Sequence, residues 1–174
     1  MKQVHGRIFR CVSVVISLMA LTLLGTSASW AQQKSLKEQL VGSWTMVSAD
    51  FIRKDGTKGN SFGDNPNGIL IFDASGRFAT VYGRPGRPHL STIALSQIPA
   101  EELAAAARAF WATHGTWSVD EAGKTLSRKS ELTLLPNNDK LESKASVAVS
   151  GNELKLLSAG AAGVTIEQTY RRAQ

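Results

Sequence analysis

The segment "VGSWTMVSAD", residues 41–50, gives the clearest indication of the fold. After Val41 it has a glycine, a small hydroxyl residue and Trp44, and apolar and polar residues then alternate. The alternation predicts a strand with Trp44, Met46 and Ser48 on one face. A tryptophan at the start of a strand can lie across the end of a barrel and close it. Gly42, two residues earlier, then lets backbone or another ring pack close.

The same motif occurs again in "HGTWSVDEAG" at residues 114–123, as Gly115-Thr116-Trp117. Outward from these two segments, the chain consists of short alternating runs separated by turn residues such as Asp73–Gly76. The other runs lie at residues 68–73, 76–83, 125–136, 140–150, 153–159 and 164–172. Eight strands at hairpin spacing predict an all-β fold, an antiparallel barrel or sandwich.

One helix interrupts the strands, in "IPAEELAAAARAFWA" at residues 98–112. Pro99 lies in its first turn, acidic residues follow, and a run of alanines favours the helix. Leu103, Ala107 and Phe110 fall on one face, so the helix is amphipathic. We expect it to plug or cover one side of the barrel; a mobile lid is the alternative.

The N-terminus has the pattern of a secretory signal peptide. Basic residues precede an apolar run at residues 11–25, and residues 29–31, Ser-Trp-Ala, carry small residues at the two positions that a signal peptidase reads. The run is short for a membrane span, although an uncleaved anchor is the alternative. We therefore expect a signal peptide at 1–31, an N-terminal linker at 32–38 and one barrel domain at 39–174. The expected location is the periplasm, or outside the cell.

Cleavage changes the composition that bears on function. The signal holds three of the 20 basic residues and none of the 14 acidic ones, which leaves a net charge of +3. This mild charge, without a dense basic block, argues against nucleic acid as a partner. The single cysteine, Cys11, leaves with the signal, so the mature chain has no disulfide, thiol nucleophile or thiolate metal ligand. No membrane span is expected after cleavage.

A tryptophan that closes a barrel needs a cover for its ring, and a guanidinium from the last strand, Arg171 or Arg172, would stack on it. The G-x-W motif on the first strand with a late arginine resembles lipocalins. The longer pattern "LVGSWTMVSAD…DGT…FGDNPNGILIFDASGRF" resembles the bacterial lipocalin-like domain family in particular, over roughly residues 38–172. The resemblance implies an eight-stranded antiparallel lipocalin-like β-barrel with one helix. The barrel would be closed by Trp44, Trp117, Arg171 and Arg172. The second G-x-W would begin the strand that resumes the barrel after the helix.

Strand parity predicts which side chains point into the barrel. The inward set is mostly apolar and would suit a small hydrophobic or amphipathic ligand. The same set would also make a solid core, since an eight-stranded barrel can be filled or hollow. The predicted lining residues are Met46, Phe78, Tyr82, Val119, Arg128, Leu132, Val147, Leu156, Ile166 and Tyr170.

Arg128 is the unusual member of this set. If Leu132 and Leu134 point inward, Ser130 and Arg128 do so too. Members of the resembled family often place a His near position 128 and an Arg near position 145, where this chain has Arg128 and Ala145; the difference weakens any transfer of a His-dependent enzymatic role. An inward Arg128 would instead bind the carboxylate or phosphate of an otherwise apolar ligand. The alternative is an inverted parity that leaves Arg128 in water.

The sequence carries few groups for chemistry. It has no Gly-rich phosphate loop, G-x-S-x-G or H-E-x-x-H motif, so we assign no catalytic residue, no metal ligand and no cofactor. The loop "GRPGRPHLST" holds Arg84, Arg87 and His89, which would attract an anionic ligand or a partner's acidic patch if they lay at a barrel mouth. Otherwise the loop is a solvated connection. His114, just before the second motif, is interpreted as a strand-edge residue.

Three functions remain open. The first is an exported protein that binds or carries a small lipophilic molecule, possibly anionic, in the barrel. The second is a barrel enzyme of the cyclase, isomerase or dehydratase type, for which only Arg128, Tyr82, Tyr170 and Glu131 offer polar groups. The third is a solid barrel that binds another envelope protein through the 83–94 loop or its basic ends. Binding is favoured because the predicted lining is apolar and the catalytic groups are few.

Overall fold

The structure is a computed structural model, and it describes residues 34–174 apart from residue 88. The predicted signal peptide lies outside the described residues. The helices are α2 (Leu36–Leu40) and α3 (Ala100–Arg108), and single 3₁₀ turns occur at Leu95–Gln97, Pro136–Asn138 and Ala161–Gly163. The strands are β1 (Gly42–Ile52), β2 (Lys58–Asn60), β3 (Asn67–Phe72), β4 (Arg77–Gly83), β5 (Phe110–Asp120), β6 (Thr125–Thr133), β7 (Glu142–Ser150), β8 (Glu153–Ala159) and β9 (Thr165–Arg172).

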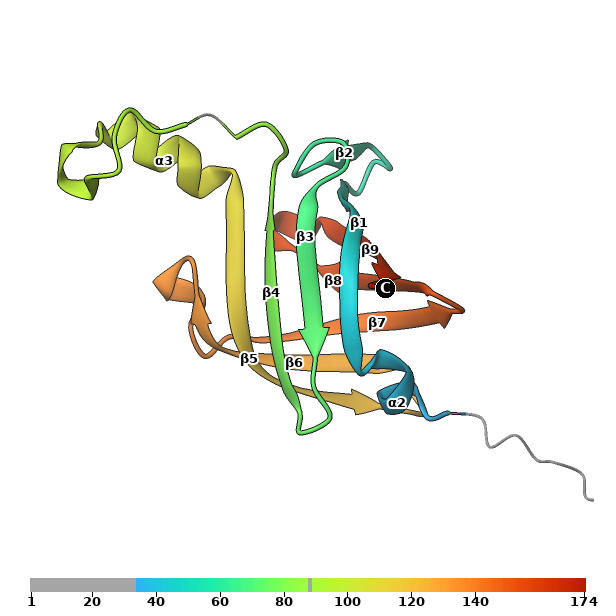
Figure 1. Ribbon diagram of the computed structural model, residues 1–174. Coiled ribbons are helices and arrows are strands. Elements are labelled where there is room, and N and C mark those ends of the chain that lie inside the picture. The colour runs from blue at the N-terminus through green and yellow to red at the C-terminus, as the bar shows by residue number, and fades with distance from the viewer. Residues whose placement is uncertain (1–33, 88) are drawn as a thin grey trace, which may run out of the picture. The chain divides into compact units, whose positions relative to one another are not determined.

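The strands form one closed antiparallel barrel. Each strand from β3 to β8 pairs with the next along the chain, β1 pairs with β3, and the pairing of β1 with β9 closes the ring. The three-residue β2 pairs only with the far end of β1, so eight strands make the barrel, as predicted. In Figure 1, β1, β3 and β4 run side by side while β6 and β7 cross behind them. The long β5 belongs to both groups, pairing with β4 and with β6.

The short helix α2 covers one end of the barrel, which we call the closed end. Ser35 and Glu38 form a reciprocal capping box at its start. The Glu121 carboxylate, from the turn after β5, accepts the backbone N–H groups of Leu36 and Lys37 at 2.7 and 2.9 Å. Leu40 at the end of α2 is fully buried in the core. Residues 36–38, predicted as linker, are therefore part of a helix that packs on the barrel.

The first G-x-W motif lies at this closed end and is covered as predicted. The Arg172 guanidinium lies 4.1 Å from the ring centre of Trp44, which is fully buried. It also donates hydrogen bonds to the backbone carbonyls of Val41 and Gln39, at 3.2 and 2.6 Å. A Cβ on Gly42 would come within 3.1 Å of the Arg172 Nη1 atom, so the glycine leaves room for the guanidinium. Arg171 is exposed and takes no part in closure, which corrects that prediction.

The second motif reaches the same end of the barrel. The Trp117 ring lies 4.8 Å from the Phe72 ring, and its Nε1 donates to the Asp73 carbonyl at 3.2 Å. A Cβ on Gly115 would collide with the backbone carbonyl of Lys129 on β6. The glycine therefore admits the neighbouring strand, and the motif repeats because two strands pack tightly around one plugged end.

Two β-bulges, in β6 and β1, change which residues face inward compared with the regular alternation predicted from the sequence. In β6 the register against β5 shifts between His114 and Gly115, so Glu131 is an extra residue. Leu132 consequently faces outward, with 58% of its surface exposed, which corrects its assignment to the lining. In β1 a shift after Met46 makes Val47 the extra residue, and Ala49 rather than Ser48 is buried beyond it.

The helix α3 is shorter than predicted and does not fill or cover the barrel. It ends at Arg108, and none of its residues is buried. Phe110 belongs to β5, where it pairs with Gly83 of β4. The aromatic pair Phe110–Trp111 favours a strand, and the ladder with β4 outweighs the helical spacing. Figure 1 shows α3 at the end of β5, pointing away from the other strands.

Candidate functional site

The barrel interior is filled in its closed half. The large side chains that fill it alternate along the strands, so that successive layers meet across the barrel axis. Five of the predicted lining residues lie in this filled core, and Val119 packs against it; the five are Met46, Phe78, Val147, Leu156 and Tyr170. The other core residues are Leu40, Trp44, Ala49, Leu70, Phe72, Trp117, Leu126, Ala145 and Leu154.

The other half of the barrel holds a cavity of about 420 Å³. It lies toward the strand ends at Gly83, Phe110 and Ala159, which we call the open end. Of the ten predicted lining residues, Phe78, Tyr82, Arg128 and Ile166 line it. The remaining lining residues are Thr80, Trp111, Thr113, Ser130, Thr133, Asn138, Leu141, Ser143, Ser158, Ala159, Gly160 and Gln168.

This lining is more polar than the sequence analysis predicted. On three strands a small hydroxyl residue follows or precedes a core residue by two positions, on the same face: Thr80 after Phe78, Ser143 before Ala145, Ser158 after Leu156. These small side chains leave space unfilled where leucines would close it. These small hydroxyl residues were visible in the strand sequences. Because they also suit positions that face solvent, residue type alone did not predict that they point into the barrel.

Arg128 points into the barrel, as hypothesised. It lines the cavity, and its guanidinium lies 5.8 Å from the Phe78 ring centre. Within residues 34–174 apart from 88, no carboxylate forms an ion pair with it and no side-chain hydrogen bond holds it. The prediction assumed that Leu132 points inward, which is wrong. Because Glu131 is an extra residue, Ser130 and Arg128 point inward although Leu132 points outward.

Two tyrosines accompany Arg128. Burial raises the pKa of Tyr82 to about 12, although the Arg128 charge and a hydrogen bond with Gln168 act in the opposite direction. Burial also raises the pKa of Tyr170, again opposed by Arg128. Both phenols therefore remain neutral at physiological pH and act as hydrogen-bond donors. Their shared interaction with Arg128 places the three groups around one region of the interior.

The Tyr170 hydroxyl is buried and has no hydrogen-bond partner in the described residues. Thr80 lies beside it and donates to the Ile69 carbonyl at 3.1 Å, but it does not reach hydrogen-bond geometry with the phenol. Buried hydroxyls are normally paired, and an unpaired one costs free energy. The Tyr170 hydroxyl is a donor without a partner, and it lies close to Arg128, which has no counter-charge in the described residues. This region is therefore suited to a ligand group that accepts hydrogen bonds.

Groups for acid–base chemistry are outside this cavity. Its lining includes no histidine and no carboxylate. Glu131, one of the polar candidates for an enzyme, faces outward and binds Arg77 through two hydrogen bonds of 2.6 and 2.7 Å. The His114 Nδ1 atom lies 3.9 Å from the same carboxylate. In the part of the chain that the structure describes, no group of three His, Cys, Asp or Glu side chains could hold a metal ion.

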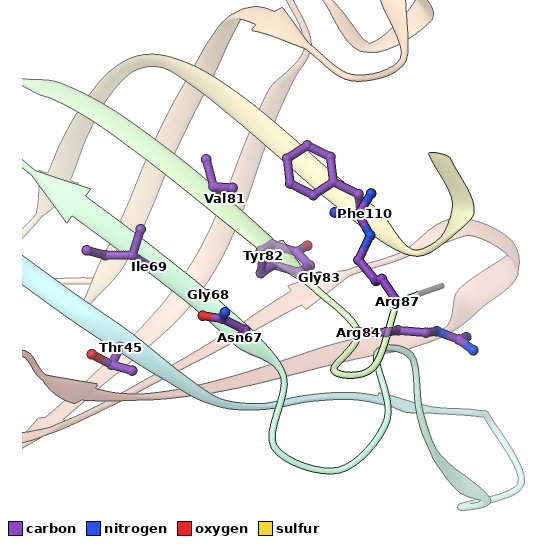
Figure 2. Close-up of a pocket in the computed structure, with 10 residues that line it drawn as sticks. All are labelled: Thr45, Asn67, Gly68, Ile69, Val81, Tyr82, Gly83, Arg84, Arg87 and Phe110. Carbon is purple, nitrogen blue, oxygen red and sulfur yellow. The ribbon is translucent and has the colours of Figure 1, made fainter. Parts of the chain in front are cut away.

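A second hollow, of about 410 Å³, lies on the outer side of the barrel near the loop that carries Arg84 and Arg87 (Figure 2). The Arg87 guanidinium lies 5.0 Å from the Phe110 ring centre, and Arg84 donates to the Ser61 carbonyl at 3.0 Å. His89 is exposed and is not part of it. Both arginines are thus held by local contacts.

An apolar groove occupies the outer face of β4, β5 and β6, lined by Ala79, Val81, Ala112, Leu132 and Leu134 among others. Leu132 reaches it because of the bulge in β6. The predicted alternative of a solid barrel would use such an exposed surface, but it also requires a filled interior, which the cavity contradicts. No helix in the described residues is long and apolar enough to cross a membrane.

Comparison with known proteins gives one family. A family model for a lipocalin-like domain matches residues 41–173. None of the curated proteins matches the sequence.

Solved structures with a similar fold are distant in sequence. A lipocalin-like protein from Bacteroides uniformis is 15% identical, with a TM-score of 0.42 over 78% of this chain and 99% of that one. A redesigned β-barrel, mFAP1, bound to DFHBI, is 14% identical, with a TM-score of 0.39 over 80% of this chain and 100% of that one. Secretory abundant heat soluble protein 4 from Ramazzottius varieornatus is 12% identical, with a TM-score of 0.41 over 82% of this chain and 100% of that one.

Proposed function

Because this chain belongs to the lipocalin-like domain family, we propose that it is an exported binding protein that holds a small amphipathic molecule in the open half of its barrel. The observation that carries the proposal is the division of the interior into a filled half and a cavity of about 420 Å³. Small-molecule sites have volumes of about 300–1,000 Å³ and combine apolar walls with a few polar groups. Trp111, Leu141 and Ile166 supply apolar wall here, and Arg128 and Tyr82 supply polar groups.

The filled half supports binding rather than passage. Trp44, Arg172 and α2 close one end of the barrel, so a ligand reaches the cavity from the opposite end. The Trp44 and Arg172 side chains around the plug donate hydrogen bonds to the backbone carbonyls of Leu40 and Gln39, which keeps the cavity walls in place without a ligand. A preformed site of this kind loses little conformational entropy on binding.

Export is the second part of the proposal and rests on the sequence of residues 1–31. Expression of the full chain in a Gram-negative host tests it through cell fractionation and the N-terminal sequence of the protein recovered. Recovery from the periplasm with residue 32 first supports export. Recovery from the cytoplasm with residue 1 retained would contradict it.

The binding test is native mass spectrometry of the protein purified without detergent, followed by titration with an environment-sensitive amphiphilic dye. We expect either a retained small molecule that denaturation releases, or a dye that becomes fluorescent in the barrel and is displaced by lipophilic compounds. Ser158→Phe should fill part of the cavity and reduce dye binding. Leu157→Phe is the matched control, because Leu157 is the next residue of β8 and is partly exposed on its other face.

A clean mass together with no dye binding would reject the proposal. So would equal binding by the wild type and Ser158→Phe, because the dye would then be bound outside the barrel. Circular dichroism and thermal unfolding of both variants show whether the barrel is intact.

A further inference from the structure

We infer that the ligand carries an acidic head group, a carboxylate or a phosphate, which lies against Arg128 at the floor of the cavity with its apolar part toward the open end. This inference rests on the proposed function and names the chemical class of the ligand and its orientation. It starts from the position of Arg128 between the filled and hollow halves of the barrel. Arg128 pairs in the ladder with Trp117 of β5 and Ser143 of β7. Trp117 belongs to the core, and Ser143 lines the cavity.

The first step is the charge of Arg128. A guanidinium inside a barrel loses hydration, and this loss is offset when an anion pairs with it. Arg128 has no such pair in the described residues, and the cavity lining offers none, because it includes no Asp or Glu. The neighbouring Phe78 ring, at 5.8 Å, provides only a weak contact. The missing counter-charge therefore has to come from solvent or from a ligand.

The second step is the set of neutral donors near that charge. Tyr82 lines the cavity, and the unpartnered Tyr170 hydroxyl is buried near it. Both phenols keep their protons at neutral pH, since the ordinary pKa of a tyrosine is 10.0 and burial raises it further. A planar guanidinium binds a carboxylate or phosphate through two parallel hydrogen bonds and leaves further lone pairs for hydroxyl donors. A cationic head would be repelled at this floor, and an uncharged one would leave the guanidinium without a counter-charge.

The third step is the direction of the ligand. Beyond Arg128, the cavity walls toward the open end include Trp111, Leu141 and Ile166. Trp111 is the second residue of β5 and Ile166 is the second residue of β9, so both lie at strand ends opposite α2. Phe62 packs edge-on against Tyr82, with ring centres 4.7 Å apart, and adds an aromatic group at the same end. An acid that enters head first therefore places its apolar part against these side chains.

The experiment compares three probes that share one alkyl chain: ω-dansylamino-undecanoic acid, its primary amide, and the corresponding alkyl phosphate as a competitor. Dansyl fluorescence is titrated against the wild type, Arg128→Met, Tyr170→Phe and Arg171→Met. Arg128→Met keeps an unbranched apolar stem and removes the guanidinium that lies over the Phe78 ring. Arg171→Met is the matched control, since it removes the same charge from an exposed position on β9.

We expect the wild type to bind the acid at least about tenfold more tightly than the amide, the ratio given by one hydrogen bond to a charged group. Arg128→Met should abolish this preference by weakening acid binding and leaving amide binding in place. Tyr170→Phe should reduce it, and Arg171→Met should leave it unchanged. Displacement of the acid by the alkyl phosphate indicates a site for both heads; failure of that displacement restricts the site to carboxylates.

Equal binding of acid and amide by the wild type would overturn the inference and leave the proposed function standing. An acid preference that survives in Arg128→Met would overturn it too. If neither probe binds, the inference fails, and the proposed function fails with it when the purified protein also shows a clean mass. Thermal unfolding and circular dichroism of each variant confirm that a change in binding does not reflect loss of the barrel.

Discussion

The two ends of the barrel are built from the same alternating strands and differ in what the inward positions carry. At the closed end these positions hold Trp44, Phe72 and Trp117, and the helix α2 adds Leu40. At the open end the same faces hold threonines, serines and Gln168 around a cavity. The alternation makes the barrel, and the size of the inward residues decides which part of it is hollow.

The two ends also differ in how their polar groups are paired. At the closed end the Arg172 guanidinium has two backbone acceptors, and the Trp44 indole N–H donates to the Leu40 carbonyl at 2.8 Å. At the floor of the cavity Arg128 and the Tyr170 hydroxyl have no such partners in the described residues. Arg172, which is paired, stabilises the fold, and Arg128, which is unpaired, is available to bind a ligand. The closed end should therefore carry most of the stability.

The largest expected effect is that of Trp44→Ala at the closed end. The ring is fully buried beneath Arg172, and its loss leaves a cavity in the core, so the free energy of unfolding should fall by about 3–5 kcal/mol. Ile166→Ala at the open end should cost much less, because Ile166 is only partly buried and borders existing space. Urea unfolding followed by circular dichroism measures both. Equal losses would show that the two ends are equally important for stability.

The next effect separates two neighbouring arginines of β9. Arg172→Met removes the group that covers Trp44 and leaves the carbonyls of Val41 and Gln39 without their donor, so we expect a loss of about 2–3 kcal/mol. Arg171→Met, at an exposed position, should change stability by less than about 0.5 kcal/mol. The chemical unfolding midpoints of the two variants give the comparison. A similar loss in both would mean that strand charge, rather than contact with Trp44, explains the effect.

The closed end was largely predictable from the sequence. The G-x-W motif, the late arginines and the family resemblance together predicted a plug with a guanidinium on a tryptophan, and the structure selects Arg172 over Arg171. This was possible because the interaction depends on local residue types at strand ends. Gly42 and Gly115 have the predicted role of admitting a close neighbour, which is a guanidinium in one case and the backbone of β6 in the other.

The open end was predicted less well, because it depends on register. The sequence alone did not reveal the bulges at Val47 and Glu131, and each moves the following residues to the other face. Leu132 was therefore assigned to the wrong side, while Arg128 was assigned correctly from a wrong premise. Whether a serine such as Ser158 faces a cavity or water depends on pairing partners far away in the chain. The cavity could be seen only once all eight strands were closed.

The smallest expected effect is on stability at the floor of the cavity, where Tyr170→Phe removes a buried hydroxyl without a partner. The free energy of unfolding should stay the same or rise by up to about 1 kcal/mol, since an unsatisfied group is deleted and the ring is kept. A loss greater than about 1 kcal/mol in urea unfolding would mean that the hydroxyl is satisfied in solution, by water or by a ligand that copurifies.

Titration of the same variant with base reports on Tyr82 alone, because Tyr82 and Tyr170 are the two tyrosines of the chain. The pKa of Tyr82 is raised from 10.0 to about 12, so the folded state holds its phenolic proton where the unfolded state releases it. The resulting stability is fully present below pH 10 and is lost as the pH rises toward 12. Tyrosinate absorbance should therefore appear in the variant near pH 12. In the wild type, Tyr170 should ionise at a higher pH than Tyr82, together with unfolding, because Tyr170 is the more deeply buried of the two. Ionisation of Tyr82 near pH 10 in the folded variant would mean that water fills the cavity around Tyr82. The part of the barrel that excludes water would then begin closer to Tyr170.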